Sequence, residues 1–368
     1  MKKSPINWWR IDVGEREAAC IQEAIQKGWI SQGPLTRKFE RELAGILNVP
    51  YVVCTTSGTS ALMMSCLAAG VGPGTEVIVP DRTWVATANA PMLLGSQVKV
   101  LPMGSRGTVM DPTGLEKLIT SRTRAILPVH LNGCAVEIKK IIDIAQMHNI
   151  TVIEDACQAF LSRSHAQCLG TFGHFGCFSL GMAKCLTTGQ GGFVVCHSEE
   201  NWHTLIQIRD QGLNPMGREA NNSILGGNFK FTDIQAAMGL GQLEQLPRRL
   251  EHQKNVYRAY QKGLENLSWI TLLPVDIAAG EIPFRADCIS DWRDRIVKKL
   301  HEHDIFPGIQ PANLHEYSHL SVGDFVKQNC PMRGKLLILP SGPDQPMENV
   351  EQTIQVLRSM DEELKAIS

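Results

Sequence analysis

Short apolar runs alternate with longer segments of helical periodicity between Tyr51 and Cys196. The runs predict five buried strands, at Tyr51–Cys54, Glu76–Pro80, Gln97–Leu101, Arg124–Val129 and Ile150–Glu154. The intervening segments predict helices, at Ser60–Gly70, Trp84–Gly95, Thr113–Thr120 and Val136–His148. Such alternation implies right-handed crossovers and a mostly parallel sheet with helices on both faces. In such sheets ligands bind at the carboxyl ends of the strands.

Further patterns flank this block. Before it, Glu15–Lys27 and Leu35–Leu47 read as amphipathic helices; after it, Thr232–Leu246 reads as a helix that Pro247 ends and Arg248–Leu267 resumes. The tail predicts a small α/β unit, with strands at Phe284–Ile289 and Lys335–Pro340 and helices at Asp291–His303 and Met347–Ala366. We therefore expect an α/β fold in two domains, a large one over residues 1–247 and a smaller one over residues 248–368.

Composition narrows the classes of function. The 368 residues are 43% hydrophobic and carry a net charge of −1, which disfavours nucleic acid and anionic membranes as partners. No signal-peptide core opens the chain, and no apolar run is long enough for a membrane span. The eleven cysteines form no CxxC pair and several lie in apolar runs, as in YVVC and FVVC. We expect reduced, buried thiols and a cytoplasmic location.

Several residues near the ends of the predicted strands could carry chemistry. Asp155 ends the run ITVIED, and Lys184 follows in CFSLGMAKCLTTGQGG; the two could form a plain ion pair. The turn TSGTSAL, residues 56–62, leads from a strand into a helix whose N-terminus suits a phosphate, although ordinary N-capping would use the same residues. Trp84 could stack on a flat cofactor or belong to the core. Together they supply a phosphate cradle, a stacking face, an anion and an amine, the four needs of pyridoxal 5'-phosphate (PLP).

These features occur in an ordered series of motifs. The series comprises GWISQGPLTRKFERELA, GPGTEVIVPDRTWVATANA, LPVHLNG, VIEDACQAF, CFSLGMAKCLTTGQGG and GGNFKFTDIQAAMGLGQLEQL. It resembles the DegT/DnrJ/EryC1/StrS family of PLP-dependent sugar aminotransferases, which have the aspartate aminotransferase fold. The resemblance covers nearly the whole chain.

The resemblance implies a role for each of eight residues. Lys184 would hold PLP through its amine and move the proton, and Asp155 would keep the pyridine nitrogen protonated. The remaining positions would bind the cofactor's phenolic oxygen (Gln158), its ring face (Trp84) and its phosphate (Gly58, Thr59, Ser179 and, from the neighbouring subunit, Asn228). The last role implies a homodimer with shared sites. No metal site is expected.

The resemblance also suggests the reaction. An amino acid, glutamate by expectation, would give its amino group to a keto nucleotide-sugar, as in perosamine-type 4-aminotransferases; an aminocyclitol route is the nearest alternative. Three departures bear on this. The stretch VLPMGSRGTVMD lacks the usual acidic pair, GQGG stands in place of GEGG, and IFPGIQPANLH lacks the arginine expected near the substrate.

Two other classes of function compete with this interpretation. Residues 315–319 read HEYSH, a literal HExxH, which in a zinc peptidase places two histidines one helical turn apart. The surrounding residues do not predict a long helix, and no third ligand is evident. A non-catalytic PLP-binding regulator is the other alternative. A dehydrating relative is disfavoured because such enzymes carry histidine where this chain has Lys184.

Overall fold

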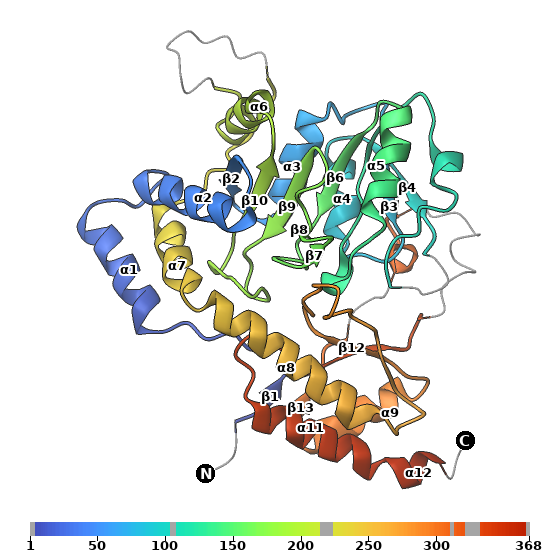
Figure 1. Ribbon diagram of the computed structural model, residues 1–368. Helices are drawn as coiled ribbons and strands as arrows, with labels where there is room; N and C mark the ends of the chain where they lie inside the picture. The colour runs from blue at the N-terminus through green and yellow to red at the C-terminus, as the bar shows by residue number, and fades with distance from the viewer. Residues whose placement is uncertain (1–3, 104–107, 214–223, 310–312, 321–331, 366–368) are drawn as a thin grey trace.

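The computed structural model describes residues 4–103, 108–213, 224–309, 313–320 and 332–365. Its two main units are built on a seven-stranded and a three-stranded sheet, each with helices (Figure 1). Two further sheets have two strands each, and one of them pairs β7 (Arg163–Ser164) with β8 (Gln167–Cys168). Among the described residues, no helix is both long and apolar enough to cross a membrane.

The large sheet has seven strands in the order β2-β10-β9-β6-β5-β3-β4. Their bounds are Tyr51–Thr55 (β2), Gly192–Cys196 (β10), Phe175–Ser179 (β9), Thr151–Asp155 (β6), Thr123–Ile126 (β5), Glu76–Pro80 (β3) and Gln97–Leu101 (β4). Strand β10 is antiparallel to both of its neighbours, whereas the other paired strands are parallel. The prediction of a mostly parallel sheet is therefore confirmed.

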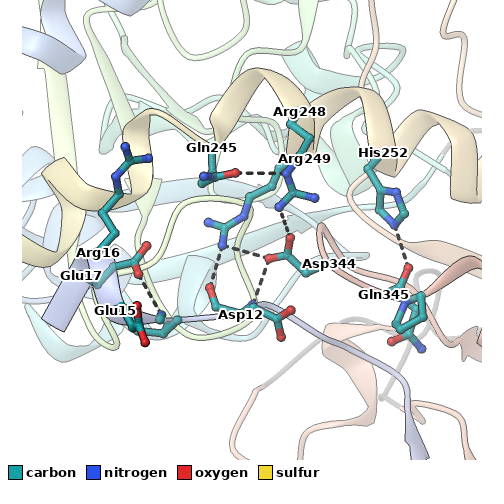
Figure 2. A pocket seen from close by; sticks show the side chains of 13 residues that line it. Asp12, Glu15, Arg16, Glu17, Gln245, Arg248, Arg249, His252, Asp344 and Gln345 are labelled. Atoms are coloured by element: carbon teal, nitrogen blue, oxygen red, sulfur yellow. Dashed lines mark hydrogen bonds and ion pairs between the residues drawn. The ribbon is translucent and has the colours of Figure 1, made fainter.

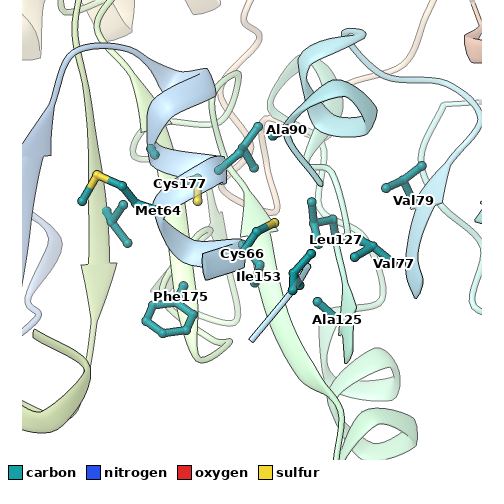
Figure 3. Packing of buried hydrophobic residues seen from close by; sticks show 14 of the residues in the cluster. Met64, Cys66, Val77, Val79, Ala90, Ala125, Leu127, Ile153, Phe175 and Cys177 are labelled. Atoms are coloured by element: carbon teal, nitrogen blue, oxygen red, sulfur yellow. The ribbon is translucent and has the colours of Figure 1, made fainter. Parts of the chain in front are cut away.

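Helices cover both faces of this sheet. Their bounds are Gly58–Ala68 (α3), Ala86–Leu93 (α4) and Glu199–Arg209 (α6) on one face, and Pro34–Leu47 (α2), Ile138–Met147 (α5) and Asp233–Leu243 (α7) on the other. Successive side chains of a strand point to opposite faces, so Val53 joins the first core and Val52 the second. Figure 3 shows the first core, where Met64 and Cys66 of α3 lie above Ile153 of β6.

The smaller unit is built on three antiparallel strands. These are Thr271–Leu272 (β11), Ala286–Ile289 (β12) and Leu336–Leu339 (β14), packed with helices Arg293–Glu302 (α9), Met347–Ser359 (α11) and Asp361–Lys365 (α12). The long helix α8, Leu246–Leu264, lies against α11 (Figure 1). Near the N-terminus, β1 (Ile6–Asn7) pairs with β13 (Ile305–Phe306). The predicted boundary between residues 247 and 248 falls inside α8 and stays a prediction.

Some elements differ from those expected. Strands β9 and β10 were not predicted. Gly176 has no side chain and therefore weakens the apolar pattern of β9. The fold requires glycine at this position, because a Cβ there would lie 1.8 Å from the backbone oxygen of Gly170. Pro247 does not end a helix: it occupies the first turn of α8, where a missing N–H is tolerated. The segment Thr113–Thr120 holds only a 3₁₀ turn, Leu115–Leu118.

Helix α1, Glu15–Gln26, packs on α7, and Asp233 at the start of α7 accepts the backbone N–H groups of Gly33 and Thr36 at the start of α2. The ten cysteines of the described residues are all free thiols, and eight are buried. The helix expected at Glu15–Lys27 and the burial of most cysteines are thus observed, whereas the reduced state of the thiols stays a prediction.

Candidate active site

A pocket of about 350 Å³ opens where the strands of the large sheet end at their carboxyl termini. Seven of the eight predicted site residues line it: Gly58, Thr59, Trp84, Asp155, Gln158, Ser179 and Lys184. The smaller unit closes the pocket with Phe284 and Arg285, which directly precede β12. The pocket therefore lies between the two units, as expected for a sheet of this kind.

Asp155 is fixed at the end of β6. Its Oδ2 accepts the hydroxyl of Thr87 at 2.7 Å, and its Oδ1 accepts the backbone N–H of Cys157 at 3.1 Å. The hydroxyl of Thr83 lies 2.7 Å from that of Thr87 and extends this series of hydrogen bonds. The carboxylate is 5% exposed. These two donors fix the direction of the carboxylate.

Lys184 reaches the same pocket from the loop after β9. Its amine lies 4.6 Å from the centre of the Phe284 ring. Lys184 and Asp155 both belong to the described part of the chain and line the same pocket, but no ion pair joins them. Burial lowers the pKa of Lys184 below its ordinary value, and the positive charge of Arg285 lowers it further, against the opposing effect of Cys157 and Asp155. A lowered pKa raises the fraction of neutral amine, the form that acts as a nucleophile and a base. The alternative of a plain ion pair is thus not supported.

The turn from β2 into α3 forms a cradle that only glycine fits. A Cβ on Gly58 would lie 2.9 Å from Cys157 Sγ and 2.9 Å from Ser179 Cβ. Ser57 caps α3 by accepting the N–H of Ser60. Free N–H groups at a helix N-terminus, together with the hydroxyls of Thr59 and Ser179, suit a phosphate group. The cap and the phosphate interpretations are therefore compatible.

Two predicted residues complete the wall. Trp84 is 52% exposed and lines the pocket, so it is not a core residue. Gln158 accepts the backbone N–H of Asn132 at 3.1 Å, which holds its amide at the pocket wall. The donors, the carboxylate, the amine and the indole ring are the set that PLP requires, so the residues present fit this cofactor.

Asn228 lies apart from the pocket of its own chain. It is exposed, its Oδ1 accepts the N–H of Lys230 at 3.4 Å, and its backbone pairs with Asp210. The contact of Asn228 with the cofactor phosphate of a neighbouring subunit stays a prediction.

Sequence reasoning did not single out several residues of the site. Among them are Cys157, Phe284 and Arg285, which line the pocket, and Thr87, which donates to Asp155. Thr87 and Cys157 follow strands β3 and β6, so their closeness to strand ends was a usable signal. The two residues before β12 carried no such signal. Of the noted departures, Gln190 of GQGG lines the pocket, whereas residues 104–107 and 310–312 lie outside the described part.

The HEYSH segment does not form a zinc site. Leu314–Glu316 is a single 3₁₀ turn (η3), His315 Nδ1 lies 2.9 Å from Asp81 Oδ2, and His319 Nε2 lies 2.9 Å from Asn89 Oδ1. The described residues contain no group of three or more His, Cys, Asp or Glu side chains that could hold a metal ion. The two histidines are thus committed to different partners.

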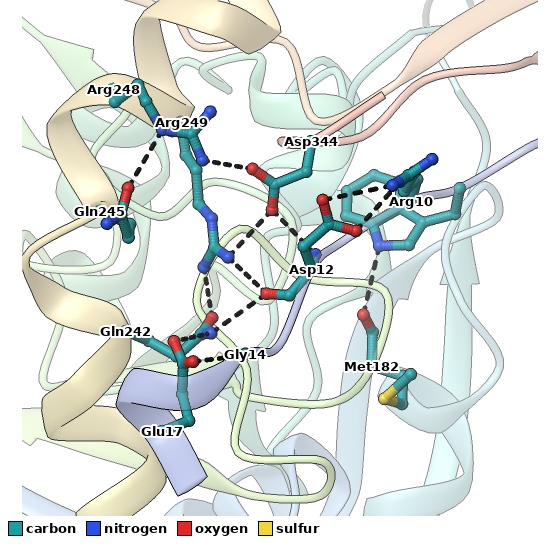
Figure 4. Close-up of polar contacts among 11 residues, drawn as sticks. Arg10, Asp12, Gly14, Glu17, Met182, Gln242, Gln245, Arg248, Arg249 and Asp344 are labelled. Carbon is teal, nitrogen blue, oxygen red and sulfur yellow. Dashed lines mark hydrogen bonds and ion pairs between the residues drawn. The ribbon is translucent and has the colours of Figure 1, made fainter. Parts of the chain in front are cut away.

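A larger hollow of about 620 Å³ lies at the start of α1 and α8 and contains none of the predicted residues. Arg248 and Arg249 there both pair with Asp344 (Figure 2). Arg249 also bonds to Gln242 and to the backbone oxygen of Asp12 (Figure 4). These ion pairs and hydrogen bonds join α8 to the segments around Asp12 and Asp344, so we interpret the hollow as a structural junction. The smaller pocket, which holds the predicted residues, is the candidate active site.

The fold and the pocket define a PLP-dependent aminotransferase. The chain belongs to the DegT/DnrJ/EryC1/StrS aminotransferase family, whose sequence model matches residues 12–357. It is 32% identical over 359 residues to a GDP-perosamine synthase of Caulobacter vibrioides, covering 95% of each chain. It is 33% identical over 253 residues to a GDP-perosamine synthase of Escherichia coli O157:H7, covering 68% of this chain and 69% of the relative.

Solved structures agree with this membership. The crystal structure of a DegT DnrJ EryC1 StrS aminotransferase from Brucella abortus superimposes with a TM-score of 0.86 at 29% identity. The match covers 94% of this chain and 95% of that one. The resemblance noted in the sequence is therefore confirmed, as are the fold class and the cofactor.

Proposed function

We propose that the enzyme moves an amino group from glutamate to the keto group of a nucleotide-linked sugar, in the manner of a perosamine synthase. The main observation behind this proposal is that Lys184, Asp155 and the N-terminus of α3 line the same pocket. The names of the two synthases that the chain resembles at 32% and 33% identity support the sugar class. We further propose that it works as a homodimer in the cytoplasm, where its free thiols stay reduced.

In this proposal Lys184 and Asp155 have different chemical roles. Bound PLP supplies a carbonyl carbon for the amino group and a ring that accepts electrons from the substrate carbon. Lys184 would hold the cofactor, and its amine would move a proton between the substrate carbon and the cofactor carbon. Asp155, aimed by Thr87 and Cys157, keeps a proton on the ring nitrogen.

The other pocket residues position the reactants. The Gly58 cradle holds the phosphate through backbone N–H groups, and Trp84 stacks on the ring. Asn228 of the partner subunit would add a phosphate contact across the two-fold interface, so that each site draws on both chains. Water is kept from the reacting centre by Phe284, which closes the pocket from the smaller unit.

A substrate screen tests this proposal. The purified enzyme is incubated with PLP, glutamate and a panel of keto-sugar nucleotides, and products are identified by mass spectrometry. We expect an aminated sugar nucleotide with formation of 2-oxoglutarate. Amination of a keto-inositol alone would support the aminocyclitol alternative. If glutamate leaves the visible spectrum of the bound cofactor unchanged, glutamate is not the amino donor. That result would favour the alternative of a non-catalytic PLP-binding regulator.

A further inference from the structure

We propose that Asn132 is a positioning residue of the active site, which links the smaller unit to Gln158 and thereby directs the Gln158 amide at the phenolic oxygen of PLP. This inference rests on the role proposed for Gln158 and adds the residue that would set its orientation. Asn132 lies in the turn Leu131–Gly133, between β5 and α5, and is 5% exposed. It is not among the described residues that line the pocket, so it would act through its neighbours.

The backbone N–H of Asn132 determines which way round the Gln158 amide lies. This N–H donates to Gln158 Oε1 at 3.1 Å. Because a backbone N–H can only donate, the side-chain atom that meets it has to be the oxygen. The Nε2 group then remains as the donor of a side chain that lines the pocket. A donor is what the negatively charged phenolic oxygen of PLP requires.

Two further hydrogen bonds join Asn132 to the segment that precedes β12. Its Oδ1 accepts the N–H of Arg285 at 2.8 Å, and its backbone oxygen accepts the N–H of Phe284 at 3.3 Å. The next residue, Gly133, has φ 83°, and a Cβ there would lie 1.9 Å from the backbone oxygen of Ile282. The turn and this segment are thus in direct backbone contact, with no space for a side chain between them.

These contacts place Asn132 between two walls of the pocket. Gln158 belongs to the large unit, whereas Phe284 belongs to the smaller unit and has its ring centre 4.6 Å from the Lys184 amine. A displacement of the smaller unit would move the Asn132 turn, and with it the N–H that holds Gln158. The side-chain bond to the N–H of Arg285 opposes that displacement.

An ordinary turn residue would explain the backbone of Asn132 but not its three bonds. Its φ of 54° and ψ of 26° are left-handed, a conformation that asparagine tolerates better than most residues. Among the described residues Asn48 and Asn149 share it, with φ 55° and 54°, and both are exposed. The left-handed turn therefore needs neither burial nor bonds to another unit, and Asn132 has both.

The phenolic oxygen provides a spectroscopic measure of this orientation. It shares a proton with the nitrogen that links bound PLP to its lysine. A donor to the oxygen stabilises its negative charge and so lowers the pH at which that proton is lost. Misdirecting the Gln158 amide should raise this pH, and the visible absorbance of the bound cofactor reports it without any substrate.

The test is a pH titration of the PLP-loaded enzyme and its variants. Asn132→Ala and Asn132→Gly both remove Oδ1, and the glycine variant keeps the left-handed backbone without strain. We expect the pH midpoint to rise by roughly 0.5–1 unit in both, the shift that corresponds to one hydrogen bond. Gln158→Met should raise it as well. In a Gln158→Met background neither Asn132 variant should add to the shift, because the group that Asn132 positions is gone.

Asn149→Ala is the matched control. It places alanine in the same left-handed conformation at an exposed position just before β6, at the opposite end of that strand from Asp155. It should lower the melting temperature through backbone strain, as Asn132→Ala does, but leave the pH midpoint unchanged. If Asn132→Ala does not fold, the glycine variant decides the question.

Four results would overturn the inference. An unchanged midpoint in the Asn132 variants would show that Asn132 does not orient Gln158, and an unchanged midpoint in Gln158→Met would remove the group it is said to orient. An equal rise in Asn149→Ala would reduce the effect to lost stability. A further shift on adding Asn132→Ala to Gln158→Met would mean that Asn132 acts by another route. Failure of wild type to react with glutamate would instead reject the proposed function, since these titrations use no amino donor.

Discussion

Replacing Asp155 with asparagine isolates the charge of this side chain from its shape. The amide oxygen can still accept the N–H of Cys157, which lies 3.1 Å from Oδ1 in the native protein. The amide nitrogen then faces Thr87, whose hydroxyl can rotate to accept it. We therefore expect a folded variant, destabilised by about 1 kcal/mol, with the phosphate cradle intact.

Turnover should fall far more than stability. Without the negative charge, the ring nitrogen loses its proton and the ring accepts electrons poorly. We expect kcat to fall roughly 10³-fold, which corresponds to about 4 kcal/mol of transition-state stabilisation. The measurements are single-turnover rates with glutamate, cofactor content by absorbance and unfolding in urea. The spectrum of the bound cofactor should also report the change in ring protonation.

Thr87 provides the matched control. Thr87→Val removes the hydroxyl that donates to Asp155 while keeping the side-chain volume, and we expect a loss of about 10-fold in kcat. Thr87→Ser keeps the donor and should stay close to wild type. Turnover of Asp155→Asn within 10-fold of wild type, with cofactor bound, would refute the reasoning and make Asp155 a structural residue.

Four further predictions follow from the same structure. Lys184→Ala should fold but lose transamination and the visible absorbance of covalently bound cofactor; near wild-type turnover would contradict its central role. Mixing inactive Lys184→Ala subunits with an inactive, bulky Asn228 variant should restore activity, because one site of the hybrid has both native residues; hybrids that exchange subunits yet stay inactive would exclude shared sites. Asp233→Asn should lower the free energy of unfolding in urea by about 2–3 kcal/mol, because the buried carboxylate caps α2, and a loss below about 0.5 kcal/mol would contradict this. Burial raises the pKa of Glu76, but hydrogen bonds from Thr120, Lys99 and Arg122 outweigh it and lower the pKa from 4.5 to about 2. This stabilisation is complete above about pH 4.5 and is lost as the pH falls towards 2, so the melting temperature of Glu76→Gln should depend less on pH in that window than that of wild type.

The local pattern of the sequence was sufficient for much of the large domain. Strands β3 and β4 begin and end at the predicted residues, Glu76–Pro80 and Gln97–Leu101, because both are apolar runs bounded by turn residues. The carboxyl ends of parallel strands meet at one edge of the sheet, so residues that follow them could be expected together. Asp155 and Trp84 were found in this way.

The tertiary structure alone decided how the pocket is closed. Strand β10 enters the sheet antiparallel, and Asp287 of the smaller unit pairs with Arg82 of the large one as well as with Arg285. Periodicity reports which side of a strand or helix is apolar, but it does not report which distant segment covers it. That depends on the path of the whole chain, since a contact between distant residues is stabilised only once both units have folded and packed together.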